Sequence, residues 1–214
     1  MIKFQAKYLK ILYPFMAQGD IRYYLNAIHI EPHPDGGAIL VATNGHMMMV
    51  IRDIEAVCTE KQTFKLNRDA LRYCAVRKGC GKTPVVLINP ITERLTIYDV
   101  EELYIQPGKC LSLLPKSGYP NYKKVIPKFS DLKTGFADVV CSRYIVEAAK
   151  IAFGRKSYRE GIRFWQAAKS GSIAVEFPFM PELLGIIMPR HEDCNPLVHW
   201  VKNFAPRPTE EVAP

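Results

Sequence analysis

Residues 142–154 read Ser-Arg-Tyr-Ile-Val-Glu-Ala-Ala-Lys-Ile-Ala-Phe-Gly, and this stretch shows how the chain around it is organised. Serine is a preferred residue at a helix start and glycine at a helix end, and the apolar residues between them recur at helical spacing. The pattern predicts a helix over Ser142–Phe153. Its expected buried face consists of Ile145, Val146, Ala149 and Ala152. Segments rich in β-branched and aromatic residues flank the helix, one before it and three after it. These predicted strands are Ala137–Cys141, Ile162–Ala167, Ser172–Phe177 and Leu183–Met188.

The same β-α-β-β-β order occurs twice more in the first half of the chain. The predicted helices there are Lys7–Gln18, which Pro14 should kink or shorten, and Asn67–Lys78. The predicted strands of the first unit are Ile2–Ala6, Arg22–Glu31, Ala38–Thr43 and Met48–Ile54, and those of the second are Thr63–Leu66, Val85–Asn89, Arg94–Tyr98 and Glu102–Gln106. A repeated unit of this kind predicts an α+β fold, with helices on one face of antiparallel sheets.

The repeats suggest four segments along the chain. Residues 1–110 hold two units and form one predicted domain, and residues 111–131 are a connector rich in Pro, Gly and Lys. Residues 132–191 hold the third unit, and residues 192–214 are a Pro-rich tail.

Composition narrows the class of protein. Hydrophobic residues make up 48% and charged residues 23% of 214, which is typical of a globular protein and excludes wholesale disorder. Apolar runs are too short to span a membrane, and lysines interrupt the N-terminal segment, which excludes an ordinary secretory signal. The six cysteines are scattered with no Cys-x-x-Cys pair, so we expect free thiols and a cytoplasmic protein without membrane association.

The net charge of +8 is concentrated in three segments. Residues 7–18, 67–78 and 142–159 together carry 11 basic and 2 acidic residues, which leaves 18 basic and 19 acidic residues in the rest of the chain. Each segment taken alone is typical of a solvated helix surface. Three basic helices on an otherwise balanced chain favour a surface that faces phosphates.

Motifs of catalysis are weak in this sequence. Gly81-Lys82-Thr83 lacks the earlier glycine of a phosphate-binding loop and follows a predicted helix, and His191, Cys194 and His199 lack a fourth metal ligand at a usual spacing. No nucleophile elbow or zinc-protease motif is present. We therefore expect no enzyme, no cofactor and no metal, and an unrecognised nucleic-acid enzyme is the weakest alternative.

Four strings, in order, resemble the bacterial DNA polymerase III beta subunit, the sliding clamp. They are Asp20-Ile-Arg-Tyr-Tyr-Leu-Asn-Ala, Val41-Ala-Thr-Asn-Gly-His, Gly118-Tyr-Pro-Asn-Tyr-Lys-Lys-Val-Ile-Pro-Lys and Ile186-Ile-Met-Pro-Arg. The resemblance implies the DNA-clamp fold. It also implies a DNA replication role as a processivity factor, in which helices of a ring face duplex DNA and a groove binds short peptides of polymerases and clamp loaders.

The chain departs from this family in length. Residues 1–128 are similar to the family's middle domain and residues 129–191 to the second half of its last domain, so three units stand where the family has six. A ring of twelve units would need four chains, or the third unit could pair with its copy in another chain. We therefore expect a homo-oligomer, a dimer or a tetramer.

Two sites follow from the resemblance. Counterparts of the family's peptide groove are Leu25, Thr43, Gly45, His46, Met48, Pro120, Val125, Ile186, Ile187, Met188 and Pro189. Without the resemblance, Met47–Val50 and Ile186–Met188 would be interpreted as strand core. The family has Arg where this chain has Met47, and it ends where this chain continues through residues 192–214.

The second expected site is the DNA-facing surface. Arg22, Tyr23 and Tyr24 match positions near DNA in the family, although strand alternation alone would bury one of the two tyrosines. Four residues are added from helix position and charge: Lys7, Lys10, Arg143 and Lys150. The main alternative is a clamp-derived interaction protein that binds clamp partners, or a clamp, without encircling DNA.

Overall fold

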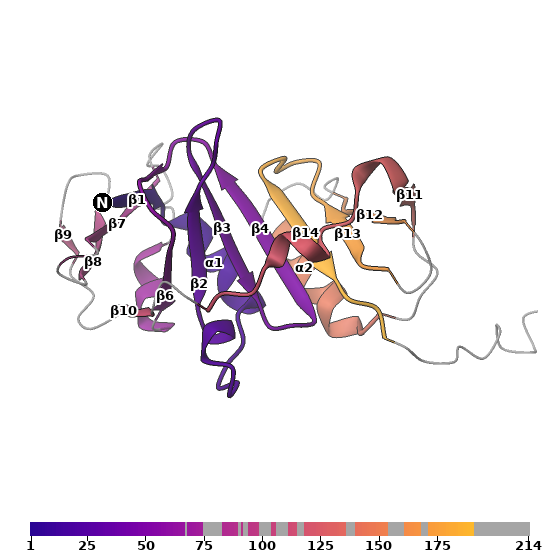
Figure 1. The fold of residues 1–214 in the computed structure, drawn as a ribbon, viewed down its shortest axis with the longest axis horizontal. Coiled ribbons are helices and arrows are strands. Elements are labelled where there is room, and N and C mark those ends of the chain that lie inside the picture. The colour runs from indigo at the N-terminus through magenta and orange to yellow at the C-terminus, as the bar shows by residue number, and fades with distance from the viewer. Residues whose placement is uncertain are drawn as a thin grey trace, which may run out of the picture.

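Two antiparallel sheets form the framework of the computed structural model (Figure 1). The structure describes residues 1–66, 68–74, 83–89, 91, 94–98, 104–105, 111–114, 118–135, 140–153, 161–167 and 171–190. Within these residues the larger sheet has nine strands in the order β10-β6-β2-β3-β4-β14-β13-β12-β11, and the smaller has five in the order β5-β1-β7-β8-β9.

The elements follow the repeated order of the sequence. The first unit comprises β1 (Ile2–Gln5), α1 (Lys7–Leu12), the 3-10 helices η1 (Tyr13–Phe15) and η2 (Tyr23–Asn26), β2 (Ile28–Pro32), β3 (Ala38–Thr43) and β4 (Met47–Asp53). After the short strand β5 (Val57–Cys58), the second comprises β6 (Gln62–Leu66), the 3-10 helix η3 (Arg68–Cys74), β7 (Val85–Asn89), β8 (Arg94–Tyr98) and β9 (Tyr104–Ile105). The connector holds β10 (Leu111–Leu114) and the 3-10 helices η4 (Tyr122–Val125) and η5 (Phe129–Asp131). The third comprises β11 (Lys133–Thr134), α2 (Ser142–Phe153), β12 (Arg163–Gln166), β13 (Ile173–Glu176) and β14 (Leu183–Ile187).

The first two units complete each other by exchanging their first strands. β1 pairs with β7 of the second unit, with Phe4 opposite Val86, and β6 pairs with β2 of the first unit, with Phe64 opposite Ile28. Phe4 and Phe64 stack between the two sheets at a centroid distance of 6.1 Å. Each unit therefore supplies a strand to the sheet of the other.

The third unit joins the first through one strand pair. β14 lies antiparallel to β4, with Ile186 opposite Met48 and Leu184 opposite Val50. This pairing extends the sheet from the first unit into the third. Residues that are far apart in sequence therefore share one continuous surface.

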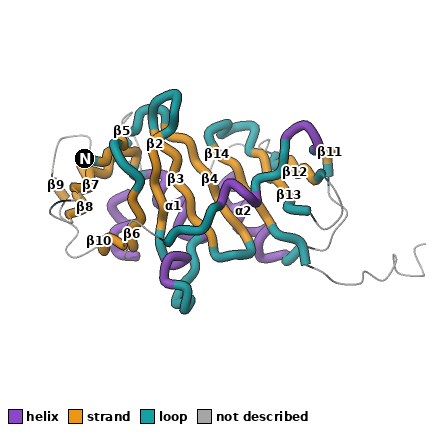
Figure 2. Tube along the Cα trace, in the orientation of Figure 1, coloured by secondary structure: helices purple, strands orange, loops and turns teal. Residues whose placement is uncertain are grey.

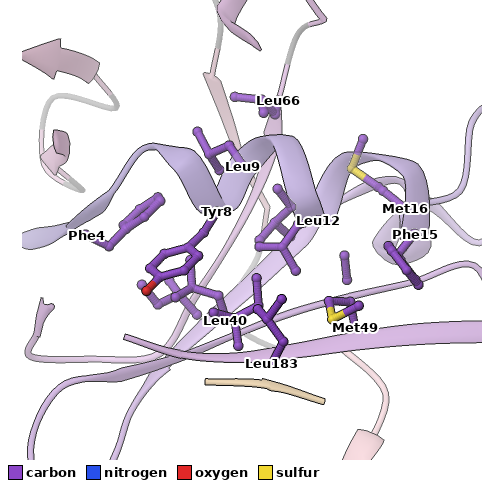
Figure 3. Packing of buried hydrophobic residues seen from close by; sticks show 14 of the residues in the cluster. Phe4, Tyr8, Leu9, Leu12, Phe15, Met16, Leu40, Met49, Leu66 and Leu183 are labelled. Carbon is purple, nitrogen blue, oxygen red and sulfur yellow. The ribbon is translucent and has the colours of Figure 1, made fainter. Parts of the chain in front are cut away.

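Strand alternation gives the nine-stranded sheet two apolar faces. On the helix face, α1 and α2 cover the sheet, and the core includes Leu9, Leu40, Met49 and Leu183 (Figure 3). On the opposite face, which we call the groove face, the buried residues are Val41, Met48, Val50, Tyr122, Ala174 and Ile186. Residues 118–132, which we call the strap, cross the groove face, while α1 and α2 lie behind the strands (Figure 2).

The predicted helices and one predicted strand can be compared with the structure. The first helix stops at Leu12 and continues as a 3-10 turn, as expected from Pro14. The predicted helix Asn67–Lys78 is a 3-10 helix over its described part, and Asn67 and residues 75–80 lie outside the described residues. The predicted strand Arg22–Glu31 begins as η2 instead, because the Asn26 side chain bonds the backbone of Asp20 in both directions, at 2.9 and 2.7 Å.

Helix α2 has the predicted bounds but a different buried face. Ala148 is buried, and Tyr144 and Ile151 pack against the core, whereas Val146 is 50% exposed. Positions 144, 148 and 151 lie on one helical face. The predicted buried face was wrong at Val146, while Ile145 and Ala149 are half-buried, because the core contacts come from Tyr144, Ala148 and Ile151 instead. Ala152, which completed that predicted face, is not among the residues whose side chains are described.

Predictions about the strands and the cysteines can also be compared with the structure, as can the length of the helices. β3, β7 and β8 have the predicted bounds. Residues 137–139 of the predicted strand Ala137–Cys141 lie outside the described residues, and residues 140–141 are not in a strand. Cys58, Cys74 and Cys141 are free, as expected, while Cys80, Cys110 and Cys194 are not described. In the part of the chain that is described, no helix is long and apolar enough to cross a membrane.

Candidate functional site

A cavity of about 210 Å³ opens on the groove face where β3, β4 and β14 meet the strap. Its floor is apolar, since Leu25, Met48 and Ile186 are all buried. Strap residues form one wall, and polar groups from η2 and the β3–β4 turn form the rim. The lining residues are Arg22, Tyr24, Leu25, Thr43, Gly45, His46, Met47, Met48, Pro120, Asn121, Tyr122, Val125, Ile186 and Met188.

The turn between β3 and β4 is held by its own side chains. The Thr43 hydroxyl donates to the Met47 carbonyl at 2.9 Å and accepts from the Gly45 amide at 3.1 Å. The Asn44 side-chain oxygen accepts from the amides of His46 and Met47, both at 3.0 Å. Gly45 adopts a φ of 89°, which favours glycine there. The Asn-Gly sequence therefore fixes the rim of the cavity.

His46 connects this turn to the third unit. The Met188 amide donates to the His46 carbonyl at 2.8 Å, and the His46 ring stacks on Tyr144 of α2 at 6.2 Å. Thus the end of β14 and the β3–β4 turn form one rim, although they come from distant parts of the chain.

Arg22 lies at the rim and is bound to Asp20. Its guanidinium donates to the Asp20 carboxylate at 3.0 and 2.8 Å, and its backbone amide donates at 2.8 Å. These hydrogen bonds lower the pKa of Asp20 to about 2, and the same side-chain bond raises the pKa of Arg22. The arginine charge is therefore positioned at the cavity but partly compensated.

The strap is fastened to both units that it crosses. The Tyr122 hydroxyl donates to the Glu31 carboxylate at 2.7 Å, and Lys123 pairs with Glu31 at 2.7 Å. Tyr119 stacks on His29 at 4.7 Å and donates to the Val41 carbonyl at 3.2 Å.

On the third-unit side, the Ser172 hydroxyl donates to the Val125 carbonyl at 2.8 Å. The cavity wall is thus tied to β2 and β3 at one end and to the start of β13 at the other.

Two pKa shifts accompany the strap. Burial would raise the pKa of Glu31, but hydrogen bonds from Lys123 and Tyr122 outweigh it and hold that pKa below its usual value. Burial lowers the pKa of His29, so its neutral form is favoured beneath Tyr119. Glu31 and His29 therefore contact the strap in the protonation states that they have at neutral pH.

The structure brings nine of the eleven predicted groove residues to this cavity. Ile187 does not line it, because alternation turns its side chain into the helix-face core, and Pro189 lies beyond the end of β14. Sequence reasoning missed Met47, Asn121 and Tyr122, and it placed Arg22 and Tyr24 at the DNA surface instead. Asn121 and Tyr122 fall inside the quoted strap string, so their position was available as a signal.

The seven residues predicted to face DNA divide between two places. Lys7 and Lys10 lie on α1, and Arg143 and Lys150 lie on α2, on the helix face. Arg22 and Tyr24 line the cavity, and the Tyr23 hydroxyl lies beside Gly118 of the strap. The structure therefore does not gather all seven on one helical surface.

The charges on the helix face differ in their partners. Lys150 pairs with Glu147 at 2.8 Å, and the Lys7 ammonium lies 4.8 Å from the Tyr8 ring centroid. Lys10 and Arg143 are exposed, and neither has a carboxylate partner among the described residues. Arg143 borders a hollow of about 860 Å³ between α2 and residues 13–20.

The described residues contain no group of three or more His, Cys, Asp or Glu that could hold a metal ion. The weak candidates His191, Cys194 and His199 lie outside them, as do Gly81 and Lys82.

Comparisons with known proteins show which solved structures this fold resembles. No protein-family model and no curated protein matches the sequence. Among solved structures, the DNA polymerase sliding clamp of Pseudomonas aeruginosa matches with a TM-score of 0.61 and 14% identity, over 89% of this chain and 65% of that one. The Caulobacter crescentus pol III beta matches with a TM-score of 0.59 and 15% identity, over 89% of this chain and 66% of that one.

The Borrelia burgdorferi DNA polymerase III subunit beta, solved with a natural product, matches with a TM-score of 0.59 and 15% identity, over 89% of this chain and 64% of that one. The chain therefore spans slightly less than two thirds of the length of these sliding clamps. Its three β-α-β-β-β units and antiparallel sheets have the DNA-clamp fold of the bacterial DNA polymerase III beta subunit.

Proposed function

We propose that this protein is a sliding-clamp-like processivity factor, which binds partner peptides in the groove-face cavity and duplex DNA with its helix face. The cavity carries the proposal, because two separate units and the strap frame a single apolar hollow. The Pseudomonas aeruginosa and Caulobacter crescentus structures that this fold matches are a DNA polymerase sliding clamp and a pol III beta, which supports the same role.

The chemistry of the cavity favours a peptide over a small molecule. Its volume of about 210 Å³ is below the roughly 300–1,000 Å³ of typical small-molecule sites. It suits one or two apolar side chains of an extended peptide, with His46 and Asn121 at the rim as polar partners. Met48 is flexible and can adapt to different anchors, which fits several partners such as a polymerase and a clamp loader.

The helix face favours phosphate contacts without base readout. Lys10 and Arg143 project from neighbouring helices on one side of the sheet, and neither lies in a groove-reading motif. Contacts to phosphates position a protein without specifying sequence, as a sliding protein requires. In this proposal the protein acts in the cytoplasm, catalyses nothing and needs no cofactor.

In this proposal the chain encircles DNA as a homo-oligomer. Three units per chain imply that four chains supply a ring of twelve, or that dimers formed through the third unit take the place of longer clamp chains. The partly exposed helix α2, with Val146 at 50%, leaves apolar surface for such an assembly.

A second candidate function is a clamp-derived interaction protein that keeps the groove but never encircles DNA. The pairing of Arg22 with Asp20 and of Lys150 with Glu147 favours it, because these ion pairs reduce the charge offered to phosphates.

Retention on DNA of different topology separates the two candidates. The purified chain is loaded onto nicked circular DNA, with a clamp loader and ATP where loading requires them. One half of the sample is then linearised, and a sizing column measures how much protein stays on each form of the DNA. A ring stays on the circle and leaves the linear form. Light scattering over a range of concentrations gives the number of chains. A monomer that is lost equally from both DNA forms would contradict encirclement and leave the groove as the function.

A further inference from the structure

The wall of the cavity continues directly into the C-terminal segment. Met188 lines the cavity and is fixed by its amide bond to the His46 carbonyl, and the last described residue is Arg190. Residues 191–214 follow, so this segment starts two residues from a groove-lining side chain. Any apolar sequence within it begins close to the site.

One part of this segment has the residue types that the cavity accepts. Residues 197–204 read Leu-Val-His-Trp-Val-Lys-Asn-Phe, with five apolar residues in eight. Prolines at 196 and 206 bracket it, and acidic residues and prolines dominate on either side. Large aromatic and aliphatic side chains are the usual anchors in peptide grooves. The floor of Leu25, Met48 and Ile186 offers them an apolar surface.

The connecting length allows an intramolecular return. Eight residues separate Met188 from Leu197, which is about 30 Å when extended, and tight reversals need about 2–8 residues. A linker this short gives an effective concentration on the order of millimolar. Even a weak interaction, with a dissociation constant of about 100 µM, would then occupy the groove about 90% of the time.

We propose that residues 197–204 bind in the groove of their own chain and compete with partner peptides. The proposal deepens the proposed function and rests on the groove being a peptide site. The consequence is regulation: a partner must displace the segment, which lowers its apparent affinity about tenfold.

The first test follows Trp200 in the full-length chain. The chain holds two tryptophans, and Trp165 serves as an internal reference because it bonds Glu176 at 2.9 Å. Both are labelled with 5-fluorotryptophan, and Trp200→Phe assigns the two fluorine resonances. Val125→Glu places a charge in the groove, and Val57→Glu is the matched control on β5, since the two valines are 38% and 45% exposed.

We expect the Trp200 resonance of the wild-type chain to differ from that of a synthetic peptide of residues 191–214. Val125→Glu should move it to the peptide position, while Val57→Glu leaves it unchanged and Trp165 stays fixed in both. A wild-type resonance already at the peptide position, or one that Val125→Glu does not move, would overturn the proposal. A resonance that depends on protein concentration would also overturn it, because the occupant would then come from a second copy.

The second test measures competition. A fluorescent synthetic peptide of residues 195–206 is titrated into the wild-type chain and into the full-length double variant Leu197→Asp, Trp200→Asp. The variant should bind the peptide about tenfold more tightly, since its own segment no longer competes. Equal binding, or binding to neither chain, would refute self-occupation. Failure of the proposed clamp function is detected by a different experiment. The protein would then not be retained on circular DNA, whatever the peptide titration shows.

Discussion

The two faces of the nine-stranded sheet use charge in opposite ways. On the groove face, Arg22 is bound by Asp20 and Lys123 by Glu31, and these pairs surround an apolar hollow. On the helix face, Lys10 and Arg143 have no carboxylate partner among the described residues. Paired charges fix a shape, whereas unpaired cations attract any polyanion. One sheet can therefore present a shape-selective site and a non-selective one.

The largest expected difference between the two faces is in how strongly salt weakens ligand binding. Three phosphate contacts, from Lys7, Lys10 and Arg143, predict a fall in DNA affinity of about 40-fold between 50 and 200 mM salt, because each contact releases counterions. Peptide binding in the groove depends on apolar burial and should change by less than about threefold over the same range. Fluorescence anisotropy with a short duplex and with the peptide of residues 195–206 measures both. Equal salt slopes for the two ligands would contradict the division.

A charge in the groove should affect only the groove face. Val125→Glu is expected to weaken peptide binding at least tenfold, because a bound peptide would bury its unpaired carboxylate against the apolar floor. Peptide titration is performed on chains that also carry Leu197→Asp and Trp200→Asp, so that the chain's own segment does not compete. Val57→Glu on the same background is the control. A matching loss of duplex binding in the Val125 variant would show that the faces are not independent.

As the pH falls, the contacts of the strap should lose stability before the helix face changes. The pKa of His29 is lowered by burial, so the unfolded chain binds more protons than the folded one as pH falls through the usual histidine range. Stability should drop there by up to about 1.4 kcal/mol per pH unit. Glu31, whose pKa is lowered in the folded chain, stabilises above its unfolded value and loses that contribution as pH falls through its folded one.

Urea unfolding from pH 7.5 to 5.5 measures the histidine part of this effect. His29→Gln should flatten the profile, and Tyr122→Phe should cost about 1 kcal/mol at pH 7.5 through its lost bond to Glu31. A wild-type profile that stays flat over this range would show that His29 is not held in its neutral form by the fold.

The sequence predicted the elements better than their contacts. Residues 38–43 and 142–153 have strong local patterns, and both elements have the predicted bounds. The face of α2 was wrong because Tyr144 counts weakly as apolar in a pattern, yet its ring packs inward and stacks on His46. The 3-10 turn at 23–26 was missed because the bonds of Asn26 to Asp20 outweigh the strand preference of the aromatic residues.

The site required long-range information. Periodicity cannot reveal that β14 pairs with β4, so the meeting of Met48 and Ile186 came only from the resemblance. Tyr122 and Asn121 belong to a segment without periodic pattern, and their place in the wall depends on the contacts with Glu31 and the third unit. The strap is thus positioned by tertiary contacts.

The smallest effect distinguishes two cations on one helix. Arg143 and Lys150 are both exposed on α2, but only Lys150 has a partner, Glu147 at 2.8 Å. Arg143→Ala should weaken duplex binding about fivefold at low salt and reduce the salt slope by about 0.9, the value of one phosphate contact. Lys150→Ala removes a charge that Glu147 already compensates, so its effect should be clearly smaller. If both variants weaken binding equally, the ion pair opens on DNA, and pairing in the free protein would not decide which cations contact phosphates.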